Sequence, residues 1–397
     1  MLGVPPYSDT ADGLYRAYLT PAYCAAQEAV AGWMAEAGMA VRRDPAANLV
    51  GRYEGGDPSA PILLIGSHLD SVRGAGRYDG PLGIMLGIEA VDALCRAGRR
   101  LPFAVEVIAF GDEEGSRFPA AMLSSRAVAG TLDRAALDIA DADGVTLAAA
   151  GADIAHYLEA ARPPGSVRAY FEAHIEQGPV LEAEGLAVGT VTGIAAQLRY
   201  RVTVSGTAGH AGTTAMDLRS DALAGAAEMI CAIENLAQRD QSDLVATVGA
   251  IEVAPGAANV VPGRVDFSLD VRSGKGSRRD RVAAAILECC EDIARHRGLR
   301  LAYELLHDLP ASPCDGRLMD LLDESVAAEG FPVRRLVSGA GHDAMIMASL
   351  APTAMLFLRC AGGVSHNPAE QVDAADADIA LRVIMRFLEK MADDATA

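Results

Sequence analysis

The sequence lacks the features that would place it in several special classes of protein. No apolar run approaches the roughly 18 residues of a membrane-spanning helix, so we expect no membrane segment. Residues 1–13 have neither a basic start nor an apolar core, so they do not resemble a secretory signal, and we expect a cytoplasmic protein. Basic residues are in deficit, and the net charge of −19 argues against a nucleic-acid partner.

Cysteine is also used sparingly and without pattern. The seven cysteines show no CxxC spacing, which excludes a zinc ribbon and suits reduced thiols better than a disulfide framework. The 397 residues are 51% hydrophobic and 22% charged, a composition typical of a globular protein. A chain of this length is sufficient for two or three domains, each with its own core.

Two styles of hydrophobic pattern divide the chain. Continuous apolar runs predict strands that are buried on both faces of an α/β sheet, at 62–66, 103–110 and 353–358. Alternation of polar and apolar residues predicts half-exposed antiparallel strands at 198–205 and 264–272. We therefore expect an α/β catalytic domain formed by residues 1–193 and 310–397, interrupted by an inserted α+β domain at residues 194–309.

Helices are predicted from start and stop signals and from composition. Residues 14–38 are expected to form one helix, with Thr20 and Pro21 as a start signal and Ala37 and Gly38 as the stop. Alanine-rich residues 131–158 are also expected to be helical. Further helices are expected at 82–96, 220–239, 277–297, 316–330 and from 373 onward.

Chemistry-bearing residues follow the first buried strand. His68 and Asp70 stand at its carboxyl end, a glycine-rich turn follows, and Asp79 then precedes a helix. An imidazole can ligate a metal while a carboxylate holds its other ring nitrogen, and a second carboxylate can reach the same ion or bridge two ions. The alternative is a solvated histidine with two aspartates in a turn.

Other histidines and carboxylates stand in similar positions. Glu113 and Glu114 follow the strand at 103–110, and His174 lies on a predicted strand at 170–176. A mixed set of histidines and carboxylates without cysteine suits zinc, manganese or a similar divalent ion. The number of groups fits two ions that share a carboxylate better than one tetrahedral ion. One of the two adjacent glutamates can ligate while the other acts as general base, although a solvated loop is the alternative.

Seven ordered motifs make the sequence similar to a known family. They are GSHLDSVRGAGRYDGPLG, FGDEEGSRF, FEAHIEQGPVLE, GHAGTT, AANVVPG, SGAGHDAM and GVSHNPAE. In this order they resemble the hydantoinase/carbamoylase type of metal-dependent amidohydrolase, which includes allantoate amidohydrolases, N-carbamoyl-L-amino-acid hydrolases and β-ureidopropionases. The resemblance implies the fold of the dizinc aminoacylases and exopeptidases, with a mixed sheet and an inserted α+β lid.

The resemblance also implies roles for individual residues of the centre. One divalent ion would be held by His68, Asp79 and His174. A second divalent ion would be held by Asp79, Glu114 and His366, with Asp79 bridging the two ions. Zinc, manganese, cobalt and nickel are the metals expected at both positions. Glu113 would be the general base, and Asp70 would position His68.

The inserted domain is expected to supply substrate-binding groups and a dimer interface. The resemblance places His210, Asn259 and Arg272 in contact with substrate, and it suggests Gln197 as a further contact. Arg272 offers a two-pronged donor for a carboxylate, and His210 can polarise a carbonyl. A homodimer formed through this domain is implied, with His210 reaching the partner's pocket.

The predicted function is hydrolysis of a ureido C–N bond in a small carboxylate, with release of ammonia and carbon dioxide. The substrate would be allantoate or an N-carbamoyl-L-amino acid. An aminoacylase or dipeptidase using the same metals on an acyl-amide bond is the alternative. A binding protein that keeps the fold without catalysis is a second alternative, opposed by the complete ligand set and Glu113.

Overall fold

The computed structural model describes residues 2–11 and 13–396 and divides into two compact units. Unit 1 contains the chain up to Thr192, residues 314–336, and the chain from Ala340 onward. Unit 2 contains Gly193–Pro313 and Val337–Gly339. Unit 2 therefore contains Gly193 and residues 310–313 and 337–339, which the sequence prediction assigns to the catalytic domain.

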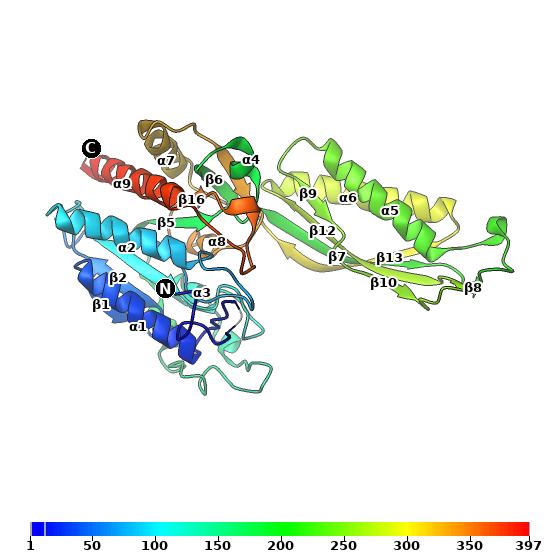
Figure 1. The fold of residues 1–397 in the computed structure, drawn as a ribbon, viewed down its shortest axis with the longest axis horizontal. Helices are drawn as coiled ribbons and strands as arrows, with labels where there is room; N and C mark the ends of the chain where they lie inside the picture. Colours follow the sequence, from blue (N-terminus) through cyan, green and yellow to red (C-terminus); the bar gives the residue numbers. More distant parts are fainter. Residues whose placement is uncertain (1, 12, 397) are drawn as a thin grey trace. The chain divides into compact units, whose positions relative to one another are not determined.

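Unit 1 is built on one mixed sheet with a parallel centre (Figure 1). Its strands are β1 (Ala40–Arg43), β2 (Leu49–Tyr53), β3 (Ile62–His68), β4 (Val105–Phe110), β5 (Val167–Ile175), β6 (Val188–Ile194), β15 (Arg335–Ser338) and β16 (Thr353–Leu358). The order is β1-β2-β4-β3-β5-β16-β6, and both β15 and the short β14 (Ser312–Pro313) pair with β6. Strands β4, β3, β5 and β16 run parallel to one another, whereas β2 and β6 run antiparallel to β4 and β16. This arrangement confirms the predicted mixed-sheet α/β fold.

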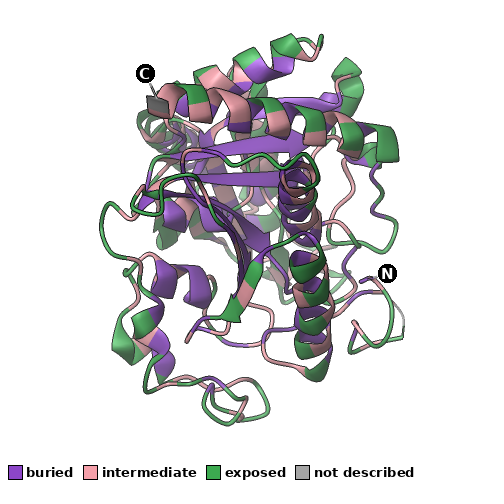
Figure 2. Cartoon of the chain, turned by 90° about the vertical axis from the view of Figure 1, so that its left-hand side faces the viewer, coloured by how far each residue is buried: buried purple, intermediate pink, exposed green. Residues whose placement is uncertain are grey.

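Helices enclose this sheet. They are α1 (Pro21–Glu36), α2 (Pro81–Arg96), α3 (Leu123–Val128), α4 (Val180–Glu184), α7 (Gly316–Ala328), α8 (Asp343–Met347) and α9 (Ala374–Thr396), with 3-10 turns η1 (Arg134–Leu137), η2 (Tyr157–Ala160) and η4 (Ala361–Gly363). Figure 2 shows buried strands between helices whose outer faces are exposed. Every residue of β3, β4 and β16 is buried, because apolar side chains on both faces of these strands meet a helix layer.

The expectation of a helix over residues 131–158 is wrong. This segment contains η1 and the first residues of η2, joined by turns. Alanine favours a helix, but Gly144 and Gly151 adopt positive φ angles of 79° and 104°. The Asp141 carboxylate also accepts backbone N–H groups from Asp143 and Val145, and such local bonds compete with helical ones.

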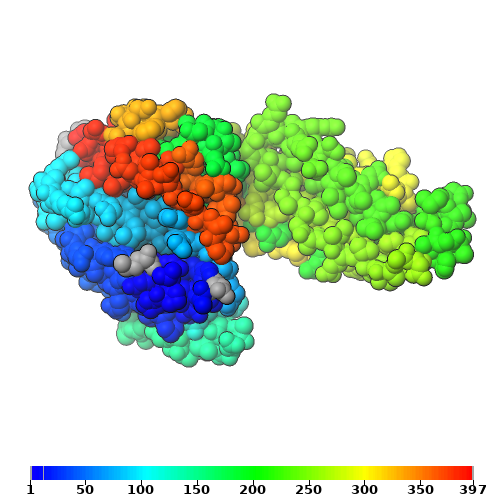
Figure 3. Space-filling view, viewed as in Figure 1, coloured from blue at the N-terminus to red at the C-terminus, as the bar shows by residue number. Residues whose placement is uncertain are grey.

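The N-terminal segment braces the loop that follows β3. Arg16 is fully buried, and its Nε donates to the carbonyl oxygen of Leu69 at 2.6 Å. Its backbone N–H donates to Ser71 Oγ at 3.0 Å. The same segment meets the region near residue 157 through a 3.0 Å hydrogen bond between the hydroxyls of Tyr18 and Tyr157, and the two segments lie together on the surface in Figure 3. The loop between His68 and Ser71 is thus fixed from outside the sheet.

Unit 2 has a smaller antiparallel sheet with two long helices. The sheet order is β10-β12-β7-β13, β9 pairs with β12, and β8 pairs with β11. The elements are β7 (Ala196–Ser205), β8 (Gly209–His210), η3 (Met216–Leu218), α5 (Ala222–Arg239), β9 (Val245–Thr247), β10 (Ile251–Ala254), β11 (Val260–Val261), β12 (Arg264–Ser273), α6 (Gly276–His296) and β13 (Arg300–Leu309). Alternate residues of β12 are buried and contribute to a core with α5 and α6, as the alternating pattern predicts.

Across the residues that the structure describes, no helix is long and apolar enough to cross a membrane. All seven cysteines are free thiols.

Candidate metal centre

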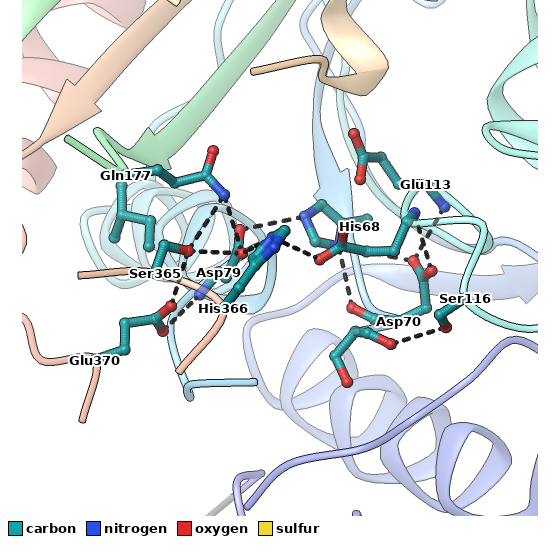
Figure 4. Close-up of polar contacts among 12 residues, drawn as sticks. His68, Asp70, Asp79, Glu113, Ser116, Gln177, Ser365, His366 and Glu370 are labelled. Atoms are coloured by element: carbon teal, nitrogen blue, oxygen red, sulfur yellow. Dashed lines mark hydrogen bonds and ion pairs between the residues drawn. The ribbon is translucent and has the colours of Figure 1, made fainter. Parts of the chain in front are cut away.

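The histidines and carboxylates singled out in unit 1 meet at the carboxyl ends of the parallel strands. His68 is the last residue of β3, and Glu113 and Glu114 follow β4. His174 is near the end of β5, Asp79 lies two residues before the start of α2, and His366 follows η4. Figure 4 shows polar contacts around His68, Asp79, Glu113 and His366. Parallel strands end at one edge of a sheet, so groups that are distant in the sequence become neighbours there.

The first cluster consists of His68, Asp79 and His174. Asp79 Oδ1 lies 3.1 Å from His174 Nε2 and 3.6 Å from His68 Nε2, and the two Nε2 atoms are 3.4 Å apart. The other ring nitrogens face carbonyl oxygens, with His68 Nδ1 3.0 Å from Asp70 O and His174 Nδ1 2.9 Å from Ile175 O. Each Nδ1 therefore carries a proton, and in the neutral rings two Nε2 lone pairs point at one carboxylate oxygen.

The second cluster shares Asp79. His366 Nε2 lies 3.1 Å from Asp79 Oδ2 and 3.3 Å from Glu114 Oε1. The side chain of His366 is 47% exposed, whereas Asp79 is 3% exposed. His366 also has a positive φ of 53°, uncommon for a residue with a side chain, which turns its imidazole toward the two carboxylates.

Two buried carboxylate oxygens in this arrangement have no hydrogen-bond donor among the described residues. Asp79 Oδ1 and Glu114 Oε1 are buried and accept no hydrogen bond from the part of the chain that the structure describes. A buried acceptor without a partner is costly, and a carboxylate more so. Imidazole lone pairs and carboxylate oxygens that converge with no hydrogen-bond donor between them are suitable ligands for divalent cations. These residues therefore fit a metal centre.

The electrostatics follow the same geometry. Burial would lower the pKa of His68, but Asp70 and Asp79 outweigh burial and hold that pKa well above its usual range. The nearby carboxylates of Asp79 and Glu114 raise the pKa of His366 to about 10. Burial would raise the pKa of Asp79, yet the three histidines hold it well below the ordinary value. The centre thus attracts positive charge strongly, as protons or as metal ions.

Asp70 anchors the turn that carries both glutamates. Its Oδ1 and Oδ2 accept the backbone N–H groups of Glu113 and Glu114, each at 3.2 Å. The Asp70 carboxylate is expected to hold His68, but the backbone oxygen of Asp70 is nearer to His68 Nδ1, at 3.0 Å against 3.6 Å for Oδ1. Asp70 therefore contacts His68 and the two glutamates together.

Glu113 is in a different environment from Glu114. It is 8% exposed and lies within a cluster with His68 and Glu114. Burial raises the pKa of Glu113 well above its ordinary value, opposed by His68 and reinforced by the neighbouring charge of Glu114. The turn that separates the two side chains begins at Asp112, whose φ is 60°. Glu113 can therefore hold a proton at a pH at which an exposed glutamate would be ionised.

Glu172 and His342 form a second group with His174. The sequence predicts that His342 lies near the pocket but assigns no role to either residue. Glu172 accepts hydrogen bonds from Ser67 Oγ, Tyr170 Oη and the backbone N–H of Ala344. The ring centroids of His174 and His342 are 4.4 Å apart, and each ring has a nitrogen within 4.8 Å of a Glu172 carboxylate oxygen. Burial and the neighbouring His174 lower the pKa of His342 well below its usual value, so its ring is neutral.

Three further missed residues surround Asp79. Gln177 Nε2 and Ser365 Oγ each donate to Asp79 Oδ2 at 3.0 Å. Glu370 accepts the backbone N–H of Asp79 at 3.1 Å (Figure 4). All three lie inside EAHIEQG and GVSHNPAE, so proximity to a predicted ligand was the available signal.

The four predicted substrate residues all lie in unit 2, in two separate groups. Gln197 and Arg272 are cross-strand partners, and both donate to Asp270, with Gln197 Nε2 at 2.6 Å and Arg272 Nε at 2.8 Å. His210 pairs with Val260 between β8 and β11, next to Asn259, and is exposed. Asp270 was missed because an alternating strand offers no signal to separate a binding carboxylate from a surface charge.

Comparisons with known proteins agree on one family. The model described as peptidase family M20/M25/M40 matches residues 64–390. N-carbamoyl-L-amino acid amidohydrolase of Geobacillus stearothermophilus is 43% identical over 384 residues, covering 96% of this chain and 94% of that protein. Allantoate deiminase of Arabidopsis thaliana is 39% identical over 418 residues, covering 96% and 79%.

A solved structure extends the similarity to the whole fold. An amidase of the hydantoinase/carbamoylase family from Burkholderia multivorans has a TM-score of 0.92 and 34% sequence identity, covering 98% of this chain and 94% of that one. The chain therefore belongs to peptidase family M20/M25/M40 and, within it, to the hydantoinase/carbamoylase amidohydrolases.

Proposed function

We propose that this protein hydrolyses the ureido C–N bond of a small carboxylate, either allantoate or an N-carbamoyl-L-amino acid. The main structural support is the pair of clusters that share Asp79 beside a buried Glu113. Relatives named N-carbamoyl-L-amino acid amidohydrolase and allantoate deiminase match almost the full chain and support the same bond type.

Two divalent ions are proposed as cofactors. His68, Asp79 and His174 would hold one ion, and Asp79, Glu114 and His366 the other. When bound, such ions supply Lewis-acid polarisation of a carbonyl and ease the deprotonation of water. Nitrogen and oxygen donors are compatible with zinc, manganese, cobalt or nickel.

Glu113 is proposed as the general base. Its high pKa suits a group that takes a proton from water and returns it to the departing nitrogen. Water adds to the ureido carbon, the C–N bond breaks, and ammonia leaves with the transferred proton. The remaining carbamate loses carbon dioxide, so one water and one ureido group yield ammonia, carbon dioxide and the amine.

Arg272 is proposed to bind the substrate carboxylate. Its Nε and Nη2 are engaged by Asp270, which holds the guanidinium plane in place. Gln197 shares Asp270 and is proposed as a neighbouring contact. His210 would polarise the substrate carbonyl, and Asn259 would donate to it.

Unit 1 is proposed as the catalytic domain and unit 2 as the lid and dimerisation domain. Gln197 and Arg272 lie at one end of the β7–β12 pair, and His210 lies beyond the other end. Gln197 and Ser205 are eight positions apart on β7, so at ~3.3 Å per residue they are about 26 Å apart. A small carboxylate is much shorter than this distance. A homodimer in which His210 serves the partner's pocket would allow both groups to reach one substrate.

An assay of ammonia release tests the proposal. The protein, loaded in turn with zinc, manganese, cobalt or nickel, would be offered allantoate, N-carbamoyl amino acids and N-acetyl amino acids. We expect ammonia and amine from a ureido substrate. Turnover of only the N-acetyl compounds, with release of acetate, would contradict the proposal and establish an aminoacylase.

A further inference from the structure

We propose that Glu370 is a positioning residue that fixes the orientation of Asp79, so that each carboxylate oxygen of Asp79 faces one cluster of ligands. The inference rests on the proposed function, because it concerns how the chain prepares Asp79 to be shared by two metal ions.

Glu370 joins two loops that are far apart in the sequence. It is 4% exposed, and its Oε1 accepts the backbone N–H groups of Tyr78 at 2.7 Å and Asp79 at 3.1 Å. Its Oε2 accepts the hydroxyl of Ser365 at 3.2 Å. One carboxylate therefore holds the backbone of Asp79 and the residue that precedes His366.

The side chain of Asp79 is held on one side only. Oδ2 accepts from Ser365 Oγ and Gln177 Nε2, each at 3.0 Å, and Gln177 Nε2 also lies 3.3 Å from Ser365 Oγ. Oδ1 accepts no hydrogen bond from the described residues and faces His174 and His68. These contacts, drawn as dashed lines in Figure 4, prevent the carboxylate from rotating and exchanging its oxygens.

The surroundings leave Glu370 little freedom. A side chain at Gly76 would overlap the Cβ, Cδ and Oε1 atoms of Glu370, so the backbone of the Asp79 loop lies directly against this carboxylate. A buried carboxylate loses solvation, and three hydrogen bonds offset part of that loss. Such an arrangement is typical of a group that orients a ligand.

The hydroxyl of Ser365 allows the positioning role of Glu370 to be tested separately from the negative charge of Glu370. It has one proton, yet its oxygen lies near two carboxylate acceptors, Asp79 Oδ2 and Glu370 Oε2. In Glu370→Gln, the amide oxygen can still accept both backbone N–H groups, and the amide nitrogen can donate to Ser365. The serine proton is then free for Asp79. Glutamine should therefore preserve the orientation of Asp79, whereas alanine should lose it.

Metal affinity provides the test. Chelator-stripped wild type and the variants Glu370→Ala, Glu370→Gln and Ser365→Ala would be dialysed against manganese alone, and bound metal would be measured with thermal stability. We expect Glu370→Ala to weaken binding about 10- to 100-fold. We expect Ser365→Ala to change affinity in the same direction and Glu370→Gln to stay within a few fold of wild type.

Asp44→Ala is the matched control. Asp44 is a buried carboxylate that accepts the backbone N–H and side-chain amide of Asn48 in the turn between β1 and β2. Its loss should lower stability and leave manganese affinity unchanged, which separates a general structural defect from loss of positioning.

The remaining outcomes test the positioning role of Glu370 and the proposed metal binding separately. If Glu370→Gln binds manganese as poorly as Glu370→Ala, Glu370 acts through its charge and the positioning role is overturned. Wild-type affinity in Glu370→Ala would overturn it as well, and if that variant does not fold, wild-type affinity in Ser365→Ala would do so. If chelator-stripped wild type binds no manganese in this experiment and no zinc in a parallel dialysis against zinc, the proposed metal function itself is wrong.

Discussion

At the scale of single residues, the adjacent side chains of Glu113 and Glu114 are expected to have different roles. Glu113 and Glu114 are consecutive, yet only Glu114 is within 3.3 Å of His366, while Glu113 is buried with a raised pKa. Glu113→Gln should lower kcat by about 10²-fold or more with metal content intact, because only proton transfer is lost. Glu114→Gln should instead lower metal occupancy. Steady-state kinetics with metal analysis separates the two, and near-normal kcat in Glu113→Gln would place the base elsewhere.

Arg272 and Arg199 form a second informative pair of residues. Both donate to Asp270, but Arg272 is the predicted partner of the substrate carboxylate. Arg272→Ala should raise KM about 10- to 100-fold through the loss of a charge-assisted hydrogen bond. Arg199→Ala removes a neighbouring positive charge and should leave KM nearly unchanged. Equal effects of the two substitutions on KM would indicate that Arg272 acts only as a counter-ion for Asp270.

At the scale of elements, the site depends on close packing between α2 and the central strands. A side chain at Gly83 in α2 would overlap the carbonyl oxygen of Ala173, which precedes His174, and would lie 3.0 Å from Ser67, which precedes His68. Gly83→Ala should therefore destabilise the protein by about 1–3 kcal/mol or more and weaken metal binding.

Gly32 in α1 is the matched control for Gly83. Nothing lies within 4 Å of a side chain added there, so Gly32→Ala should stabilise the helix by about 0.5–1 kcal/mol without altering metal affinity. Denaturant unfolding measures both variants. A Gly83→Ala variant as stable as Gly32→Ala would show that α2 can move without cost.

The elements also show how far a sequence can be interpreted without a structure. Strands β3, β4 and β16 were predictable because both faces are apolar. The helix expected over residues 14–38 was correct only from Pro21, because Thr20 caps α1 and residues 14–20 are not helical. The segment 131–158 was not, because helix propensity is local and the competing bonds of Asp141 are specific to the folded loop. The candidate ligands, whose side chains meet around Asp79, could be proposed from their motifs. Glu370, Asp270 and Glu172 could not, because their roles depend on which loops meet in space.

At the scale of the whole molecule, bound metal should contribute to the stability of the fold. The converging acceptors of both clusters repel one another unless protons or cations lie between them. A metal at 100 times its dissociation constant adds about 2.7 kcal/mol per independent site. Chelation should therefore lower Tm in calorimetry, Glu113→Gln should show the same shift, and elemental analysis should find two ions per chain. An unchanged Tm or a single ion in fully active enzyme would contradict this expectation.

A pair of inactive variants can determine whether His210 acts in its own chain or in the pocket of a partner chain. If His210 serves the partner's pocket, each pocket combines Glu113 of one chain with His210 of the other. A heterodimer of His210→Ala and Glu113→Gln chains then contains one complete pocket and should have about half the wild-type activity. The reciprocal heterodimer pairs a wild-type chain with a chain that carries both substitutions. Its two pockets each lack one group, so it should be inactive. If His210 acts within its own chain, the two results are exchanged, and the measured activities of purified heterodimers therefore decide between the arrangements.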